Sequence, residues 1–311
     1  MERIRSEPPR GRAAILAFGA LAAIYLVWGT AFLAIRVGVQ EIPPFLMGAM
    51  RFLVAAGILA LIAARFEHPK RIPIRQWRTY CLAGVAMFLG GNGLVSYGEV
   101  HVPSGIAAIL NSTIPLWMVL VEIARRRLHP SWGVAAGIGG GVLGVAILVG
   151  PSPAEPLDLV AAAAILLAAA SWAVGSLWVR DDDPKAGPLT VAAVQMGAGG
   201  LALLLVATLT GEVTSFDPGT VSFGAWVSLA WLILPAGVVT YGSYTYSLRV
   251  WPAHLVATYP YVNSVVAVGL GALLLSEPLT LSTLSGSALV LASAAVIAFR
   301  AVPRRRAAMA Q

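Results

Sequence analysis

Residues 13–37 have the sequence AAILAFGALAAIYLVWGTAFLAIRV, in which Arg36 is the only charged residue. About 20 apolar residues in a helix cross the roughly 30 Å hydrocarbon core of a bilayer, so this stretch is long enough to span a membrane. Gly and Pro within such stretches are tolerated. Nine further apolar segments follow along the chain, at 43–64, 77–98, 104–124, 131–150, 157–179, 188–209, 222–247, 253–274 and 280–300. The sequence therefore predicts an all-α membrane protein with ten transmembrane helices.

The composition supports a membrane protein and excludes several other classes. Of 311 residues, 58% are hydrophobic and 11% are charged, whereas an ordinary soluble domain has about 25% charged residues. The net charge of +7 arises from basic residues scattered between apolar segments, without the basic patch and interleaved aromatics of a nucleic-acid-binding protein. The single cysteine, Cys81, excludes an intramolecular disulfide and a cysteine-cluster metal site.

The basic residues predict the orientation. Of the 21 Lys and Arg residues, all except Arg36 and Arg51 lie in the two termini or in the loops after the even-numbered spans. The loops after the odd-numbered spans contain no Lys or Arg but contain acids, namely Glu41, Glu99, Glu155, Asp158, Glu212, Asp217 and Glu277. The positive-inside rule then places both termini in the cytoplasm of a bacterial inner membrane protein. The first apolar run is too long for a signal peptide and lacks a clear cleavage site, so we expect an uncleaved first span.

The two halves of the chain resemble each other at fixed offsets. A shift of 144 residues aligns Trp28 with Trp172, Arg36 with Arg180 and Pro44 with Pro188, and a shift of 149 aligns Gly93 with Gly242, Tyr97 with Tyr246 and Pro103 with Pro252. Five spans per half is an odd number, so the second copy is inverted, as in many secondary transporters. We expect a cytoplasmic tail at 1–12, a first repeat at 13–150, a periplasmic linker at 151–156, an inverted repeat at 157–300 and a cytoplasmic tail at 301–311.

Short motifs in both halves carry a family resemblance. The stretches Trp28-Gly29-Thr30-Ala31-Phe32, Arg51-Phe52, Pro115 and Ser276-Glu277-Pro278-Leu279-Thr280 resemble those of the drug/metabolite transporter superfamily, specifically proteins with two tandem EamA-type domains. Within it, the chain looks most like the YddG-type exporters of amino acids, including aromatic ones. His129-Pro130 departs from the pattern where the first half usually has a Glu, and Ala173 and Gln195 replace the Gly and Arg of the second half. The resemblance implies a central cavity lined by spans 1, 3, 4, 6, 8 and 9, with spans 5 and 10 as support.

Motifs for catalysis and cofactors are weak. Gly139-Gly140-Gly141-Val142-Leu143-Gly144 matches G-x-G-x-x-G, but it lies inside an apolar span with no preceding strand, so nucleotide binding is not expected. Gly133, Gly137 and Gly141 instead form a small-residue stripe for helix packing, against span 10 or a second subunit. The histidines are isolated and lack metal-ligand spacing. We therefore expect no enzyme, no cofactor and no metal, and leave monomer or homodimer undecided.

The few charges within the spans bear on the substrate. The middles of all ten spans contain no carboxylate, and charges at that depth are usually functional. This counts against a cation exporter with a central acid and against simple proton antiport through one. Arg36, Glu99 and Glu122 lie near helix ends, where they can reach the interfaces. A phosphate-bearing substrate would need several Arg or Lys residues, so a net-neutral, zwitterionic substrate fits best.

Polar and aromatic residues at mid-span are the candidate substrate-binding residues. They are Tyr25, Trp28, Asn92, Asn111, Ser171, Trp172, Tyr241, Tyr259 and Asn263. Trp28 and Trp172 would flank the cavity, while Pro115 and Pro260 would permit helix bends. The alternative for Asn and Ser is hydrogen bonding between helices. For Tyr246 an aromatic belt at the interface is favoured over the site, Tyr244 approaches the same interface, and Tyr241 is one turn deeper.

These observations predict a transporter that exports amino acids or similar small zwitterions by alternating access. The alternatives are a broad drug or organic-cation exporter and, from another class, a membrane enzyme or lipid-handling scaffold. The expected partners are a small-molecule substrate and the lipid bilayer.

Overall fold

The computed structural model describes residues 12–67, 72–127, 131–149, 157–180, 186–251, 256 and 258–300, and within these ranges the chain is helical without strands. Eight helical stretches are long and apolar enough to cross a membrane, and two shorter apolar helices, Tyr259–Leu274 and Leu281–Ile297, bring the number to ten. The predicted ten-helix membrane fold is confirmed. The two predicted tails, the linker at 151–156 and the His129-Pro130 departure lie outside the described residues, apart from Arg12 at the end of the first tail.

The first five spans contain seven α-helices and one π-helical segment. They are α1 (Arg12–Val39), α2 (Pro44–Phe66), α3 (Ile74–Gly84), η1 (Val85–Gly93), α4 (Leu94–Gly98), α5 (Ser104–Asn111), α6 (Ile114–Ala124) and α7 (Trp132–Val149). Span 3 is thus α3, η1 and α4 in succession, and span 4 is α5 and α6 separated by Ser112 and Thr113.

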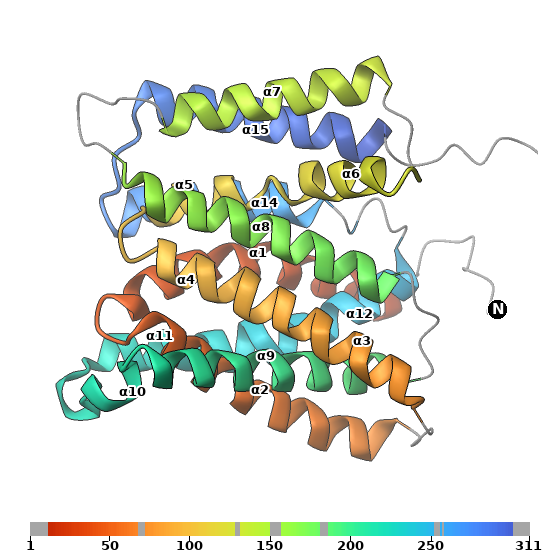
Figure 1. The fold of residues 1–311 in the computed structure, drawn as a ribbon, viewed down its shortest axis with the longest axis vertical. Helices are drawn as coiled ribbons and strands as arrows, with labels where there is room; N and C mark the ends of the chain where they lie inside the picture. Colours follow the sequence, from red (N-terminus) through yellow and green to blue (C-terminus); the bar gives the residue numbers. More distant parts are fainter. Residues whose placement is uncertain are drawn as a thin grey trace, which may run out of the picture.

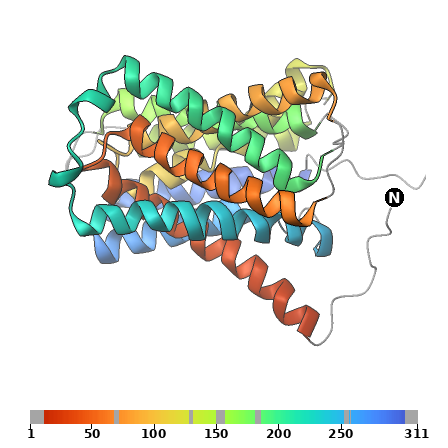
Figure 2. The same ribbon diagram turned by 90° about the horizontal axis from the view of Figure 1, so that it is seen from below.

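The second five spans repeat this plan. They are α8 (Leu159–Arg180), α9 (Pro188–Leu209), α11 (Phe223–Ile233) with η3 (Leu234–Val239) and α12 (Thr240–Val250), α14 (Tyr259–Leu274) and α15 (Leu281–Arg300). The short α10 (Glu212–Ser215) and η2 (Pro218–Thr220) lie between α9 and α11. Figure 2 shows the axes of most of these helices roughly aligned, with α1 (red) inclined to its neighbours.

The packing partners of the spans have the symmetry of the repeat. Span 2 packs against span 7 (α2 with α9), and span 5 packs against span 10 (α7 with α15). In both pairs the two spans are equivalent members of the two repeats. Span 1 packs on spans 8 and 9, through α12 and α14, while span 6 packs on spans 3 and 4, through η1 and α6. The α2–α9 pair and the α7–α15 pair lie at opposite edges of the bundle, with the other spans between them (Figure 1). This pattern supports two inverted five-helix units.

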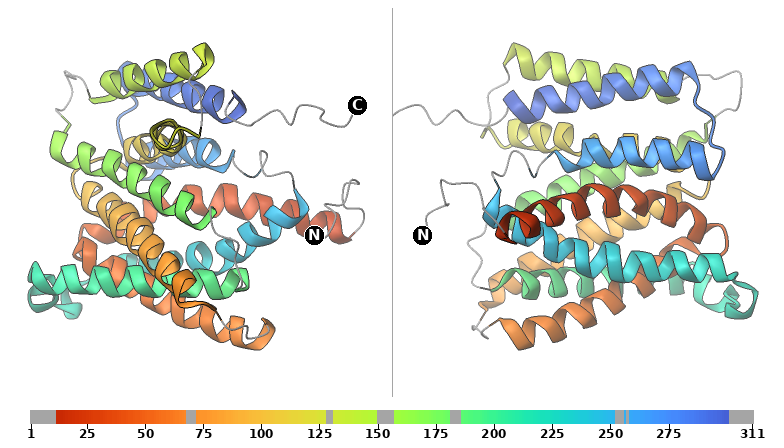
Figure 3. Two further views of the ribbon diagram at one scale, coloured as in Figure 1. Left: turned by 45° about the vertical axis from the view of Figure 1, so that its right-hand side comes forward. Right: turned by 180° about the vertical axis from the view of Figure 1, so that it is seen from behind.

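Glycines of span 5 allow close packing inside the molecule. A Cβ on Gly144 would lie 2.8 Å from Val290 Cγ2 and 3.0 Å from the carbonyl of Gly286, both in α15. A Cβ on Gly137 would lie 2.7 Å from Ile297, also in α15. The views from the front and behind both show α7 and α15 side by side (Figures 1 and 3). Of the predicted stripe, Gly137 thus faces span 10, whereas a Cβ on Gly141 would meet Leu116 of α6 in span 4.

Four glutamates join the two repeats by capping helices of the opposite half. Glu67 accepts hydrogen bonds from Leu189 N at 2.8 Å and Thr190 N at 3.0 Å at the start of α9, and Glu212 accepts one from Leu46 N at 2.8 Å at the start of α2. Glu41 caps α11 through Ser222, and Glu277 caps α5 through Ser104 and Gly105. A carboxylate at a helix N-terminus accepts hydrogen bonds from the free N–H groups and interacts favourably with the positive end of the helix dipole.

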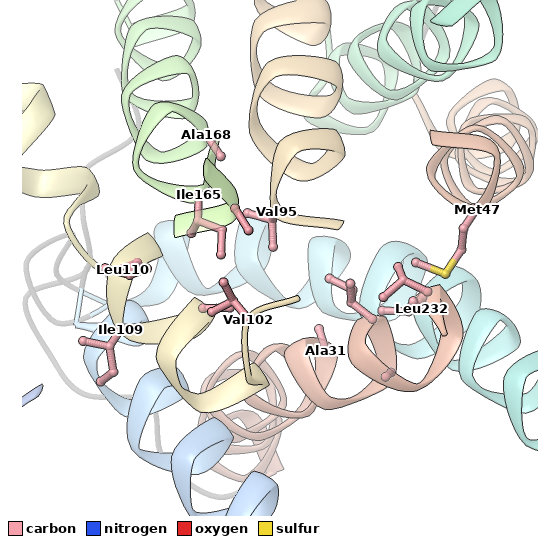
Figure 4. Close-up of a cluster of buried hydrophobic side chains, with 14 of the residues drawn as sticks. Ala31, Met47, Val95, Val102, Ile109, Leu110, Ile165, Ala168 and Leu232 are labelled. Atoms are coloured by element: carbon pink, nitrogen blue, oxygen red, sulfur yellow. The ribbon is translucent and has the colours of Figure 1, made fainter. Parts of the chain in front are cut away.

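An apolar core connects the halves near one end of the bundle. It includes Ala31 of α1, Met47 of α2, Ile109 of α5, Ile165 of α8 and Leu232 of α11, all at most 7% exposed (Figure 4). Because both repeats contribute to this core, the two five-helix units are packed as one body around the middle spans.

Candidate functional site

The two π-helical segments lie at equivalent places in the repeat. η1 begins at Val85 and η3 begins at Leu234, which is 234 − 85 = 149 residues later, the offset that aligns Gly93 with Gly242. Such segments are rare in helices and are frequent at functional sites. They interrupt spans 3 and 8, two of the spans expected to line the central cavity.

An aromatic group forms where α1 meets the second repeat. The indole Nε1 of Trp28 donates a 2.9 Å hydrogen bond to the carbonyl of Ala236 in η3. The Trp28 ring lies 5.0 Å from the ring of Tyr259 and 5.6 Å from that of Tyr244, and Tyr244 lies 6.2 Å from Tyr241. These spacings and tilted arrangements are those of favourable aromatic pairs. The aromatic group of Trp28, Tyr241, Tyr244 and Tyr259 thus joins spans 1, 8 and 9.

Two polar candidates border the aromatic group. The Tyr25 hydroxyl shares a 2.7 Å hydrogen bond with Thr258 Oγ1. With its amide turned so that the nitrogen faces backbone carbonyls, Asn263 donates to Tyr25 O at 2.9 Å and to Tyr259 O at 3.0 Å. Asn263 is 4% exposed. Its amide therefore holds α1 to α14, which was the alternative interpretation for a buried Asn.

The symmetry mate of Trp28 makes a corresponding contact in the other half. Trp172 of α8 packs on Phe88 of η1, with ring centroids 5.8 Å apart, and a Cβ on Gly91 of η1 would lie 3.1 Å from the Trp172 ring. Beside it, Ser171 Oγ donates a 2.7 Å hydrogen bond to the carbonyl of Ala86 in η1. In each half, therefore, a side chain of the first span binds a carbonyl in the π-helical segment of the opposite repeat.

Apolar side chains link the two sets of contacts. Trp172 and Tyr241 both pack against the same buried cluster, which includes Met87 and Phe88 of η1 and Phe52 of α2. Trp172 also packs against a second buried cluster, which contains Ile114 of α6. The structure thus brings Trp28, Tyr241, Tyr259 and Trp172 to the junction of the repeats, together with Tyr25, Ser171 and Asn263.

The remaining candidates lie outside the aromatic group, in spans 3, 4 and 9. Asn92 is half-buried in η1, where its amide donates to Met87 O at 3.4 Å, and Asn111 is half-buried as the last residue of α5. Pro115 is the second residue of α6, directly after the break at Ser112 and Thr113. Pro260 is the second residue of α14. Within the described residues, Pro115 thus adjoins an interruption of its span, and Pro260 lies in the first turn of a helix.

The sequence did not predict the positions of Tyr244 and Glu99. Tyr244 was expected at the cytoplasmic interface, yet its ring lies 5.6 Å from Trp28 inside the aromatic group; its spacing of three residues from Tyr241, one helical turn, was the available signal. Glu99 was expected to reach an interface, but the structure buries it at 0% exposed, and Arg51 is 7% exposed. The sequence offered no pattern for this burial, because it depends on the opposite repeat covering the turn.

Comparisons with known proteins agree with this architecture. The profile of the EamA-like transporter family matches residues 13–150 and 159–299. The chain belongs to this family. It is a multi-pass membrane transporter of the drug/metabolite superfamily rather than an enzyme.

Relatives in bacteria and archaea match over most of their length. The chain is similar to the uncharacterized inner membrane transporter YedA of Escherichia coli K12, with 34% identity over 85% of this chain and 84% of YedA. It is 25% identical to an uncharacterized transporter of Archaeoglobus fulgidus over 87% of this chain and 94% of that protein. A solved structure described as a crystal structure of protein, 20% identical, covers 94% of this chain and 99% of that chain with a TM-score of 0.60, a likeness in fold alone.

Proposed function

We propose that this transporter exports amino acids or similar small zwitterions across the bacterial inner membrane by alternating access. The observation that carries the proposal is that, in each repeat, a side chain of the first span donates a hydrogen bond to the π-helical segment of the other repeat, through neighbouring rather than equivalent residues. Trp28 binds Ala236 O, and Ser171 binds Ala86 O. In inverted-repeat transporters the substrate site lies where the repeats meet, and interrupted helices expose backbone groups there.

The chemistry of the junction supports a net-neutral substrate. Its side chains are the indoles of Trp28 and Trp172, the phenols of Tyr241 and Tyr259, the hydroxyl of Ser171 and the amide of Asn263. Hydroxyls and backbone dipoles can meet the two ends of a zwitterion, and aromatic faces can meet its ammonium group. The resemblance to YddG-type exporters favours amino acids, including aromatic ones, within this class.

The proposal includes the orientation and the limits of the repeats. Both termini lie in the cytoplasm, because the basic residues gather on the side of the even-numbered loops. The functional units are residues 13–150 and 157–300, and residues 151–156 connect them in the periplasm. Outward transport then carries substrate from the face of Glu67 to the face of Glu41 and Glu277.

Counterflow in proteoliposomes tests the function. Vesicles with the purified protein are loaded with unlabelled amino acids, and uptake of a radiolabelled amino-acid mixture is followed with and without methyl viologen as competitor. Saturable exchange of amino acids is expected. Exchange of methyl viologen alone would assign an organic-cation exporter instead. No flux of either solute, in protein with an intact unfolding transition, would contradict transport of both classes.

Two substitutions test the location of the site. Trp28→Ala and Asn92→Ala are each expected to reduce amino-acid counterflow, since both residues lie on spans that meet at the junction. Trp132→Ala is a matched control, because Trp132 is 93% exposed at the start of α7. If both site variants exchange amino acids at the control's rate, the site lies elsewhere.

A further inference from the structure

Three of the eight tyrosines have a phenol hydroxyl that makes no hydrogen bond to the protein, although their side chains are half-buried. They are Tyr241 and Tyr244 of α12 and Tyr259 of α14. No hydroxyl, amide or carbonyl in the part of the chain that the structure describes pairs with any of the three phenol oxygens. These hydroxyls are therefore available to a ligand.

The other five tyrosines differ from these three. The hydroxyls of Tyr25, Tyr80 and Tyr261 form hydrogen bonds with described residues. Tyr97 and Tyr246 are each 37% exposed, so surrounding water or lipid headgroups can reach their hydroxyls. Because buried polar groups in proteins normally have a hydrogen-bond partner, three unpaired phenols in one place indicate a partner that the protein itself does not supply.

The three phenols form one group within the junction of the repeats. The ring of Tyr244 lies 6.2 Å from that of Tyr241 and 6.0 Å from that of Tyr259, measured between centroids. Each phenol interacts electrostatically with the other two. From the first repeat, Trp28 packs on the rings of Tyr244 and Tyr259. The three hydroxyls are thus near enough to one another to serve a single ligand.

A carboxylate is the ligand group that suits these three hydroxyls. Each phenol offers one O–H donor, and an ionised carboxylate has about four positions that accept a hydrogen bond. Hydrogen bonds from O–H groups to a carboxylate are short and roughly twice as strong as those between neutral groups. A phenol oxygen is a weaker acceptor than donor, because its lone pairs are partly delocalised into the ring. Three phenols therefore favour an anionic group over an ammonium group.

The charged side chains of the same spans do not replace the phenols in this role. Among the side chains that the structure describes on α1, α12 and α14, the charged one is Arg36. Its guanidinium donates to the backbone carbonyls of Glu99 and Val100 in the turn after α4. A substrate carboxylate at the aromatic group would thus be held by neutral donors, which also disfavours a phosphate, since phosphates are usually bound by Arg or Lys.

We propose that the hydroxyls of Tyr241, Tyr244 and Tyr259 bind the carboxylate of the transported solute. The proposal rests on the proposed function and narrows it, because the solute must then carry a carboxylate, which an amine or an organic cation lacks. All three phenols belong to the second repeat, and Trp28 of the first repeat packs on two of them. The bound carboxylate therefore lies where the repeats meet, as alternating access requires.

The first test uses pairs of compounds that differ only at the carboxylate. Alanine, leucine and phenylalanine are each compared with the corresponding amide, which keeps the amino group and the side chain but loses the negative charge. Each compound competes with the radiolabelled amino-acid mixture in counterflow by the wild-type protein. We expect each amide to compete about tenfold to hundredfold more weakly than its amino acid, the range that corresponds to a hydrogen bond with a charged group.

The second test removes the hydroxyls. Tyr244→Phe keeps the ring that packs on Trp28 and loses only the O–H group, so we expect the half-inhibitory concentration of the amino acids to rise about tenfold and that of the amides to stay unchanged. Tyr241→Phe and Tyr259→Phe are expected to narrow the difference between amino acid and amide in the same way. Tyr246→Phe is the matched control, because Tyr246 lies on the same helix with an exposed ring, and both values should equal those of wild type.

The outcomes separate this site from the proposed function. Equal inhibition of wild-type counterflow by amino acids and their amides overturns the carboxylate site, and so does full wild-type discrimination in all three site variants. Absence of wild-type counterflow overturns the proposed function. Thermal unfolding of the purified wild-type protein then decides on the site without transport, because a bound ligand raises the unfolding temperature. The amino acids are expected to raise it and the amides are not; equal shifts within every pair, or no shift with any of the compounds, overturn the carboxylate site.

Discussion

The indole N–H of Trp28 donates a 2.9 Å hydrogen bond to the carbonyl of Ala236, which lies in the π-helical segment of the opposite repeat. Buried indoles usually have such a partner. The corresponding contact of the other half, Ser171 Oγ to Ala86 O at 2.7 Å, is also made to a π-helical segment. The hydrogen bonds across the junction thus join the first span of each repeat to a π-helical segment, a feature that is frequent at functional sites.

Trp28→Phe tests whether this hydrogen bond positions the site. The substitution keeps an aromatic ring but removes the N–H, and a hydrogen bond contributes about 0.5–1.5 kcal/mol. We expect the initial rate of amino-acid counterflow to fall by roughly threefold to tenfold, because 1.4 kcal/mol corresponds to about a factor of ten. Trp178→Phe, on the exposed side of α8, should retain the wild-type rate. Equal rates for the two variants would remove Trp28 Nε1 from the mechanism.

Thr240→Val tests the support of the second π-helical segment. Thr240 is 0% exposed, and its hydroxyl donates a 2.7 Å hydrogen bond to the carbonyl of Pro235, five residues earlier. Valine has nearly the same shape but cannot donate, so Pro235 O loses this partner. The expected loss is about 0.6 kcal/mol of unfolding free energy, typical of side-chain hydrogen bonds in membrane proteins. Thermal unfolding in detergent measures it, and a Thr240→Val variant as stable as the wild type would contradict this support.

Much of this fold follows from apolar run length and charge asymmetry, because the bilayer requires both. The offset of 144 residues also predicts that Trp28 and Trp172 occupy equivalent positions. In the structure each contacts the π-helical segment of the opposite repeat, η3 for Trp28 and η1 for Trp172. The π-helical segments did not follow from the sequence, since glycine-rich stretches such as Gly90-Gly91 are compatible with either register. The burial of Glu99 also depends on packing between distant spans.

Gly144→Ala tests the packing of α7 against α15. A Cβ at this position would lie 2.9 Å from Val290 N and 3.0 Å from Gly286 O, and backbone atoms cannot move aside as a flexible side chain can. Overpacking typically costs about 1–3 kcal/mol, so we expect a lower unfolding temperature. Gly139→Ala is the control, because nothing lies within 4 Å of its added Cβ and alanine favours helix by roughly 1 kcal/mol. A destabilised Gly139→Ala with an unaffected Gly144→Ala would contradict this packing.

Acidification should release the cap that Glu41 provides to α11. Hydrogen bonds from the backbone N–H and hydroxyl of Ser222, at 2.6 and 2.7 Å, lower the pKa of Glu41 below its ordinary value of 4.5. A carboxyl with a lowered pKa in the folded state stabilises it above the ordinary value, and this stabilisation is lost as the pH falls through the lowered pKa. Hydrogen exchange of peptides covering Ser222, measured from pH 6 downward and corrected for intrinsic rates, should therefore show protection that is lost below about pH 4.5. In Glu41→Gln the same peptides should show weaker protection that does not vary with pH over this range. Protection that falls identically in both proteins would mean that another group controls the first turn of α11.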